Sequence, residues 1–426
     1  MTRLLTTIAL TALLLTACGG DDAADTTTEP TEPAAEAAAA VASEPEAMAS
    51  SEPAAATEPA EAMTEEAPGD DPRAADADAL AATFDGVAFP FDAQTEENAP
   101  LFTYLAATGE DPALVAGALR GMAATHRAVE VEGYVLVDDE YAEVVLTHLV
   151  PDADPAVLLA AIDAGATLFN LDAGPDARVR DAMIAAAEAV GDPALTTAVV
   201  DEIWQADWET DPAISAFMLD AVSSGDPVLT TSALFRVETA NAFTLAERSA
   251  FVDAILPLVG APDPVVHGSA LQALGNLARE IAGDPRVDAI QSGAEAGLAH
   301  ADVYVRGSAV TALEGIGRLS AVPLLIGVLG DVEEGALGSV STTAYDGTQT
   351  SVGYDVSPWS TVTDAALVAI SSLTSGTPYH FDYFGYDIDP SLPTPVDDQI
   401  LAVAAEAEAW FAANAAAIEA DAAAQA

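Results

Sequence analysis

The sequence predicts an all-α fold, a solenoid built from pairs of helices, and two observations lead to this prediction. Asp-Pro pairs recur along the chain. Each is a strong helix start, because aspartate caps free N–H groups and proline loses no hydrogen bond at the first helical position. The main starts are 34 to 43 residues apart, with secondary starts about halfway between them, which indicates two helices per repeat. The main starts lie at the Asp-Pro pairs of Asp111, Asp154, Asp192, Asp226 and Asp263, with Asp302 in place of a sixth pair, and the secondary starts lie at Pro175-Asp176, Asp211 and Asp284.

Apolar residues within these segments follow a helical period. Val266, Ala270, Leu274 and Leu277 lie four, four and three residues apart, so they form one stripe on the helix that starts at Asp263. The small alanines allow neighbouring helices to approach closely. We therefore expect about six to eight helical pairs stacked in a row.

Three of the predicted helices share a sequence motif. It has the form Asp-x-x-Val-Arg/His-x-x-Ala-x-x-Ala-Leu/Ala, and glycine often ends the helix. The motif occurs in segments 263–277 and 302–317, and segment 176–191 matches it except that Met183 stands in place of the first alanine. It resembles the second helix of HEAT repeats, and segment 322–331 resembles the first helix of a following repeat. The resemblance implies a HEAT-like α-solenoid over residues 81–334. The sequence departs from the pattern at His267, which stands where arginine is usual, and in the irregular units between about residues 210 and 240, which leave the number of repeats open.

The N-terminal segment holds a short apolar run that ends at the single cysteine, Cys18. Arg3 precedes the run, and small residues come just before the cysteine. This arrangement resembles the lipobox of bacterial lipoproteins. The resemblance implies that residues 1–17 are a signal peptide, that Cys18 is lipidated, and that the protein is lipid-anchored in the bacterial cell envelope, facing the periplasm or the exterior. The alternatives are an ordinary secretory peptide or a membrane span, although a span needs about 20 apolar residues.

Residues 18–80 are expected to form an acidic, disordered tether. They repeat acidic residues, proline and alanine and contain no aromatic residue. Apolar burial therefore cannot offset the entropy of the chain. One interpretation is a spacer that holds the folded part away from the membrane, and the other is a tail without a role. No later segment is expected to cross a bilayer.

The C-terminal part, residues 335–426, departs from the repeat rhythm. Small and β-forming residues surround Asp346 and Gly347, which predicts a small β-hairpin insertion near the C-terminal end of the solenoid. A helix capped by Ser360 is expected next, and a last helix from about residue 395 to residue 417. These helices are expected to close the array.

Aromatic residues gather between the last two predicted helices. The candidate partner-binding residues are Tyr379, Phe381, Tyr383, Phe384 and Tyr386. Tyrosine provides a large contact area at low entropy cost, so a recognition surface for a peptide or glycan is one interpretation. The other is a cap over the exposed end of the solenoid, which terminal repeats require. The nearby Asp382, Asp387 and Asp389 offer oxygen ligands for Ca²⁺, but no EF-hand loop follows and no metal site is predicted.

The chain is strongly acidic, with 69 acidic residues, 12 basic residues and a formal net charge of -57. This charge argues against nucleic acid as a partner. All basic residues are arginine, and the absence of lysine excludes Schiff-base chemistry. Arg178, Arg180 and Arg306 either pair with carboxylates of a neighbouring repeat or contact a partner. The acidity resembles that of proteins from salty habitats, and a compositional drift of a GC-rich genome is the alternative.

No catalytic or metal-binding constellation is recognisable, and no cofactor is expected. The histidines are scattered, at positions 126, 148, 267, 300 and 380. The leading hypothesis is a non-enzymatic, envelope-anchored scaffold that binds a protein of the envelope and contacts the membrane through the lipid on Cys18. A second is an accessory or lyase-like protein for cofactor or chromophore attachment, since some HEAT-like families are linked to that role. A third is a purely structural, salt-adapted surface protein.

Overall fold

A computed structural model of the chain divides into two units, Met1–Glu66 and Ala67–Ala426. All residues that the structure describes belong to the second unit. They are residues 71–130, 139–168, 177–203, 212–239, 244–333, 338–343, 349–354, 361–383 and 396–425. The predicted signal peptide, Cys18 and most of the predicted tether therefore lie outside the described residues.

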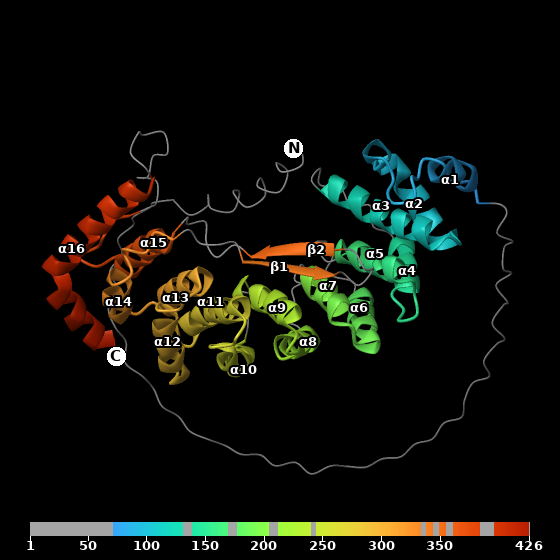
Figure 1. The fold of residues 1–426 in the computed structure, drawn as a ribbon. Helices are drawn as coiled ribbons and strands as arrows, with labels where there is room; N and C mark the ends of the chain where they lie inside the picture. The colour runs from blue at the N-terminus through green and yellow to red at the C-terminus, as the bar shows by residue number, and fades with distance from the viewer. Residues whose placement is uncertain are drawn as a thin grey trace, which may run out of the picture. The chain divides into compact units, whose positions relative to one another are not determined.

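The second unit is an array of helices in two layers (Figure 1). One layer consists of α3 (Pro112–Glu130), α5 (Pro155–Ala166), α7 (Pro193–Ile203), α9 (Pro227–Thr239), α11 (Pro264–Glu280), α13 (Val303–Ile316) and α15 (Val362–Thr374). The other consists of α2 (Ala99–Thr108), α4 (Asp139–His148), α6 (Ala177–Val190), α8 (Pro212–Val222), α10 (Leu245–Ile255), α12 (Arg286–Gly297) and α14 (Val322–Ile326). Helix α1 (Ala74–Ala81) precedes the array, and α16 (Val396–Gln425) closes it. Short 3₁₀ turns are η1 (Phe91–Ala93), η2 (Glu96–Asn98), η4 (Leu256–Leu258) and η5 (Leu319–Ala321).

The predicted helix starts are confirmed. Asp154, Asp263 and Asp302 each accept hydrogen bonds from backbone N–H groups two or three residues further on, which satisfies donors that have no partner within the helix. The main series of starts produces α3, α5, α7, α9, α11 and α13, and the secondary series produces α6, α8 and α12. The alternation of the two series along the chain is thus the alternation of the two layers.

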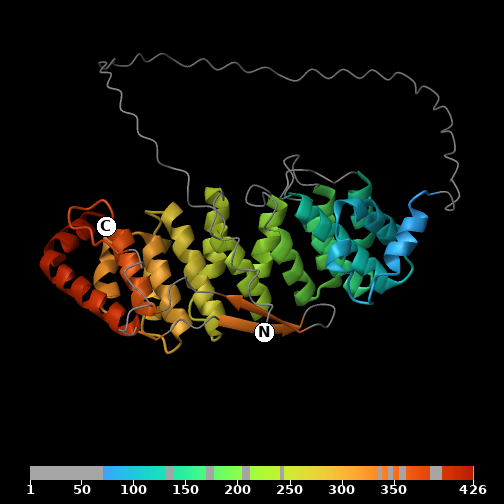
Figure 2. The same cartoon turned by 90° about the horizontal axis from the view of Figure 1, so that it is seen from above.

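The two layers differ in how closely their helices approach each other. Consecutive helices of the α3 to α15 layer pack directly on one another, whereas those of the α2 to α14 layer touch much less. The array therefore curves, with the α3 to α15 layer on the inside (Figure 1). Seen from above, the helices form one continuous row (Figure 2). This pairing of antiparallel helices in two layers is the architecture of a HEAT-like α-solenoid.

One feature of the sequence motif has to be corrected. The segment that starts at Asp176 forms α6, which lies in the opposite layer from α11 and α13, although the three share the motif. The motif describes a capped helix with one buried stripe, and helices of both layers meet that requirement. In α6 the stripe is Val179, Met183, Ala186 and Ala187, and all four are buried.

The predicted β-hairpin insertion is also corrected. The backbone of β1 (Gly338–Thr343) pairs antiparallel with β2 (Gln349–Tyr354) in a two-stranded ladder. Its turn at Asp346 and Gly347 lies outside the described residues. Side-chain burial is described for neither strand, and a β-hairpin inserted into the solenoid is not shown. A two-stranded ribbon has little independent stability, and the fold class is the helical array alone.

The two ends of the array differ in detail from the predicted boundaries. Helix α1 starts before residue 81, and its Ala77 and Leu80 are buried. Near the other end, the side chain of Thr361 caps α15, whereas the predicted cap, Ser360, lies outside the described residues. Helix α16 continues to Gln425, well beyond the predicted end at residue 417.

Candidate functional site

The aromatic segment after α15 packs against the end of the solenoid. Tyr379 and Tyr383 are buried and Phe381 is half-buried, while Phe384 and Tyr386 lie outside the described residues. The Tyr383 hydroxyl donates a hydrogen bond to the buried carboxylate of Asp364 in α15. Side chains that are buried in this way hold the end of the array together, so their packing favours the cap interpretation over an open recognition surface.

Helix α16 completes this cap. Trp410 donates a hydrogen bond from its indole Nε1 to the carbonyl oxygen of Tyr379 at 2.7 Å, and its ring lies 5.3 Å from that of Phe381. The Tyr379 hydroxyl in turn donates to Asp421 at 2.9 Å. Residues 398–425 are also long and apolar enough to cross a membrane by length and composition alone, although no segment after the N-terminal one was expected to cross a bilayer. Alanine dominates this helix, and its Ile418 is fully buried against the array.

The arginines bind together successive parts of the solenoid. Their ion pairs join residues that are 25 to 35 positions apart, which is about one repeat. The pairs are Arg178 with Glu143 at 2.7 Å, Arg236 with Asp201 at 3.3 Å, Arg286 with Asp253 at 2.8 Å, Arg306 with Asp331 at 2.6 Å and Arg318 with Asp288 at 2.6 Å. Arg178 and Arg306 therefore pair with carboxylates of neighbouring elements, whereas Arg180 pairs with the adjacent Asp181.

Arg306 is the most enclosed of these arginines. Its side chain is 12% exposed, and it donates to Asp331, to Glu333 and to the backbone carbonyl oxygens of His300 and Ala301. The guanidinium thus joins α13 to the loop before it and to the chain after α14. Such a set of hydrogen bonds is structural, because it uses most of the donors that arginine has.

Among the described residues, the histidines belong to no group of three or more His, Cys, Asp or Glu side chains that could hold a metal ion. The structure nevertheless brings two of them together, His267 in α11 and His300 before α13, with ring centroids 5.4 Å apart. His267 is buried, and within the described part of the chain its Nε2 has no hydrogen-bond partner. Burial and the neighbouring His300 lower the pKa of His267. His148 instead donates from Nε2 to the carbonyl oxygen of Ala106 at 2.9 Å.

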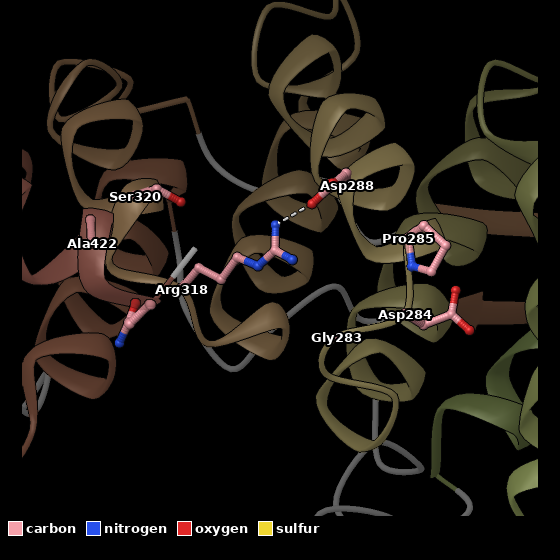
Figure 3. Close-up of a pocket in the computed structure, with 8 residues that line it drawn as sticks. Gly283, Asp284, Pro285, Asp288, Arg318, Ser320 and Ala422 are labelled. Atoms are coloured by element: carbon pink, nitrogen blue, oxygen red, sulfur yellow. Dashed lines mark hydrogen bonds and ion pairs between the residues drawn. The ribbon is translucent and has the colours of Figure 1, made fainter.

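A polar cavity of about 260 Å³ lies where α12, η5 and the end of α16 meet (Figure 3). Arg318 extends across the cavity and pairs with Asp288. Asp284 also lines the cavity, and hydrogen bonds from Arg286 lower the pKa of its carboxyl to about 2. From α16, the side chain of Gln425 accepts a hydrogen bond from the backbone N–H of Leu319. The cavity is therefore a seam between the array and its cap, whose polar groups already engage one another.

A second polar cluster lies where α9, α11 and α13 pack together. Ser269 and Tyr304 hydrogen-bond through their hydroxyls at 2.9 Å, and burial raises the pKa of Tyr304 to about 12. The ring of Tyr304 fits because residue 268 is glycine, where a Cβ would lie 2.3 Å from the ring. Glu238 at the end of α9 lies close to this hydroxyl, and burial raises the pKa of its carboxyl to about 7. No sequence motif identified these groups.

The three aspartates that offer oxygen ligands for Ca²⁺ lie mostly beyond the described residues. Asp387 and Asp389 lie outside them, and Asp382 is exposed, with its carboxylate 4.0 Å from His380. Cys18, the predicted lipidation site, also lies outside the described residues. Its role stays a prediction from the sequence.

Comparisons with known proteins concern the fold. No protein-family model matches the chain, and no curated protein matches it. Among solved structures, Kap95p, described with RanGDP in nuclear import complex assembly, is 12% identical with a TM-score of 0.47 and matches 73% of this chain. Kap121p is 11% identical with a TM-score of 0.45 over 74% of this chain. An engineered protein is 16% identical with a TM-score of 0.27, over 74% of this chain and 97% of its own. The matches span 41% of Kap95p and 33% of Kap121p.

Proposed function

We propose that the protein is a non-enzymatic, envelope-anchored scaffold that binds a protein partner along the inside of its solenoid. The observation that carries this proposal is the continuous layer from α3 to α15, which lies along the inside of the curve (Figure 1). Extended concave surfaces of this kind suit partners that make contact with several repeats at once. The function therefore belongs to the surface of the array rather than to one pocket.

Charge indicates what kind of partner suits this surface. The chain has 69 acidic residues and only 12 arginines, and many described arginines already pair with carboxylates of the solenoid. The remaining carboxylates leave a strongly negative field around the protein. Such a field accelerates the approach of a basic partner and repels anionic surfaces. We infer a protein partner with a basic contact surface, and not nucleic acid.

Anchoring is the second part of the proposal. The lipobox resemblance at Cys18 supports lipidation in a bacterial envelope, with the acidic segment before α1 as the spacer. Cell fractionation of the full-length protein and of Cys18→Ser tests this part. We expect the unchanged protein in the membrane fraction and the variant in the soluble fraction. Equal membrane association of both would contradict the anchor.

Partner binding is tested separately. The full-length protein is crosslinked in envelopes at native salt, purified and analysed for bound protein. Recovery of one protein in a stoichiometric amount is the expected result. A bound small molecule without a protein would favour the accessory or lyase-like alternative, and an empty eluate would favour a purely structural role.

A further inference from the structure

A small polar cavity lies between α9, α10 and α11. Its volume is about 120 Å³. Since one water has a share of about 30 Å³ in the liquid, the space fits roughly four waters or one small polar group. It is lined by Val237, Glu238, Arg248, Asn276, Leu277, Arg279 and Glu280.

Arg248 presents hydrogen-bond donors that the protein does not use. Its side chain is only 16% exposed, and its closest carboxylate, on Glu280, is 3.6 Å away. Among the described residues, no hydrogen bond is formed by its guanidinium. Arginine has five N–H donors, so those of Arg248 can take an acceptor that enters the cavity. Arg306, with its carboxylate and carbonyl acceptors, shows how the same side chain is satisfied elsewhere in this solenoid.

Arg279 adds a second positive charge to the same cavity. Its Nε donates only a long hydrogen bond, 3.5 Å, to the carbonyl oxygen of Gly315, and no carboxylate pair of Arg279 occurs within the described ranges. Glu280 balances one of the two arginines, and residues 240–243, which follow α9, contain no charged residue. Glu238 is the other carboxyl that lines the cavity, so the cavity carries a net positive charge when Glu238 is protonated.

We propose that this cavity binds a carboxylate, held by Arg248 and Arg279. A carboxylate is planar and has two oxygens, which match the paired donors of a guanidinium. Asn276 is already fixed at the wall, because its Nδ2 donates to the backbone carbonyl oxygen of Glu238 at 2.9 Å. The carboxylate comes either from a small free acid or from the end of a peptide chain.

Glu238 makes this binding dependent on pH. Burial raises the pKa of its carboxyl to about 7. Below that pH the neutral carboxyl tolerates a bound carboxylate and can donate to it, whereas above it two negative charges repel each other. The groups that face Glu238 are Arg248 from α10, Arg279 and Glu280 from α11, and the neutral Tyr304 hydroxyl from α13. Binding is therefore expected to weaken as the pH rises above about 7.

The test is an NMR titration of the arginine Nε–Hε signals in the full-length protein at pH 6. Sodium acetate is compared with sodium chloride at equal ionic strength. We expect a saturable, acetate-specific shift of the Arg248 signal. In Arg248→Gln, the apparent affinity for acetate, measured from the remaining Arg279 signal, should fall at least about tenfold. The matched control Arg318→Gln changes an arginine already paired with Asp288 and should leave the acetate response unchanged.

Two further comparisons complete the test. Glu238→Gln should bind acetate at pH 6 as the unchanged protein does. Its acetate affinity should not fall when the pH is raised to 8. A short alanine peptide with a free C-terminal carboxylate, compared with its amide, distinguishes a chain end from a free acid as the source. An absent acetate-specific shift, unchanged binding in Arg248→Gln, or equal binding of the amide would overturn the proposal. The result does not depend on the scaffold function, since no protein partner takes part.

Discussion

Gly275 and Gly315 bring the backbones of α11 and α13 into direct contact. A Cβ added at Gly315 would lie 2.6 Å from the carbonyl carbon of Gly275, and one added at Gly275 would lie 2.6 Å from the Cα of Ala312. Real Cβ atoms do not approach a backbone so closely, so the two helices could not keep this spacing with larger residues. The close spacing on the inside of the array depends on these small residues.

Gly315→Ala should therefore destabilise the protein. The added methyl group has no space and must push α13 away from α11, a kind of overpacking that typically costs about 1 to 3 kcal/mol. The measurement is the free energy of unfolding in urea. Gly330→Ala is the matched control, because no atom lies within 4 Å of the position of its Cβ. An equal change in both variants would contradict the role of the close contact.

Arg306→Gln should be much more damaging than Arg178→Gln. The first variant leaves the carboxylate of Asp331, whose side chain is 22% exposed, without its main partner, at a cost of about 2 kcal/mol. The second breaks a pair whose side chains are 59% and 60% exposed, which is worth less than about 1 kcal/mol. Thermal unfolding of the two variants in the same buffer measures the difference. If both cost the same, enclosure of Arg306 is not what makes its ion pairs important.

The helix starts could be predicted from the sequence because capping is local. An aspartate next to a proline acts on the first turn of its own helix, whatever that helix packs against. Assignment to a layer was less reliable, as α6 shows, because a capped helix with one buried stripe suits both layers. The hairpin was likewise predicted from local residue preferences, around Asp346 and Gly347. The corrected fold class does not include a hairpin.

The candidate sites depend on contacts between distant segments, which the sequence does not display. Glu238 and Tyr304 come together only because α9, α11 and α13 pack side by side, and His267 meets His300 for the same reason. The aromatic residues after α15 were found from composition alone. Composition could not separate a cap from a recognition surface, because that choice depends on whether α16 covers Tyr379.

The contribution of His267 to the free energy of unfolding should fall on acidification. Burial and the nearby His300 lower its pKa in the folded protein below the ordinary value of 6.5. The unfolded chain then binds more protons below about pH 6.5, so this contribution decreases as the pH falls through that value. His267→Gln should unfold with a weaker dependence on pH between 6.5 and 5. Glu238 has the opposite effect from about 4.5 to 7, but it is present in both proteins and cancels in the comparison. Identical pH profiles would contradict the assignment.

Salt should stabilise the protein. Its net charge of -57 causes repulsion within the compact state. The Debye length falls from about 10 Å at 0.1 M salt to about 3 Å at 1 M, which screens most of this repulsion. We expect the melting temperature to rise steadily over this range of NaCl. A flat melting temperature would show that the acidity does not limit stability and would favour genome composition as its origin.

Partner binding along the inside of the solenoid can be tested by photo-crosslinking in cell envelopes. A crosslinking residue is placed at Phe235 of α9, whose side chain is 39% exposed, and in a matched protein at Glu295, an exposed position of α12 in the other layer. We expect that one protein is captured in a stoichiometric amount from position 235 and not from position 295. Capture from neither position, or equal capture from both, would contradict it.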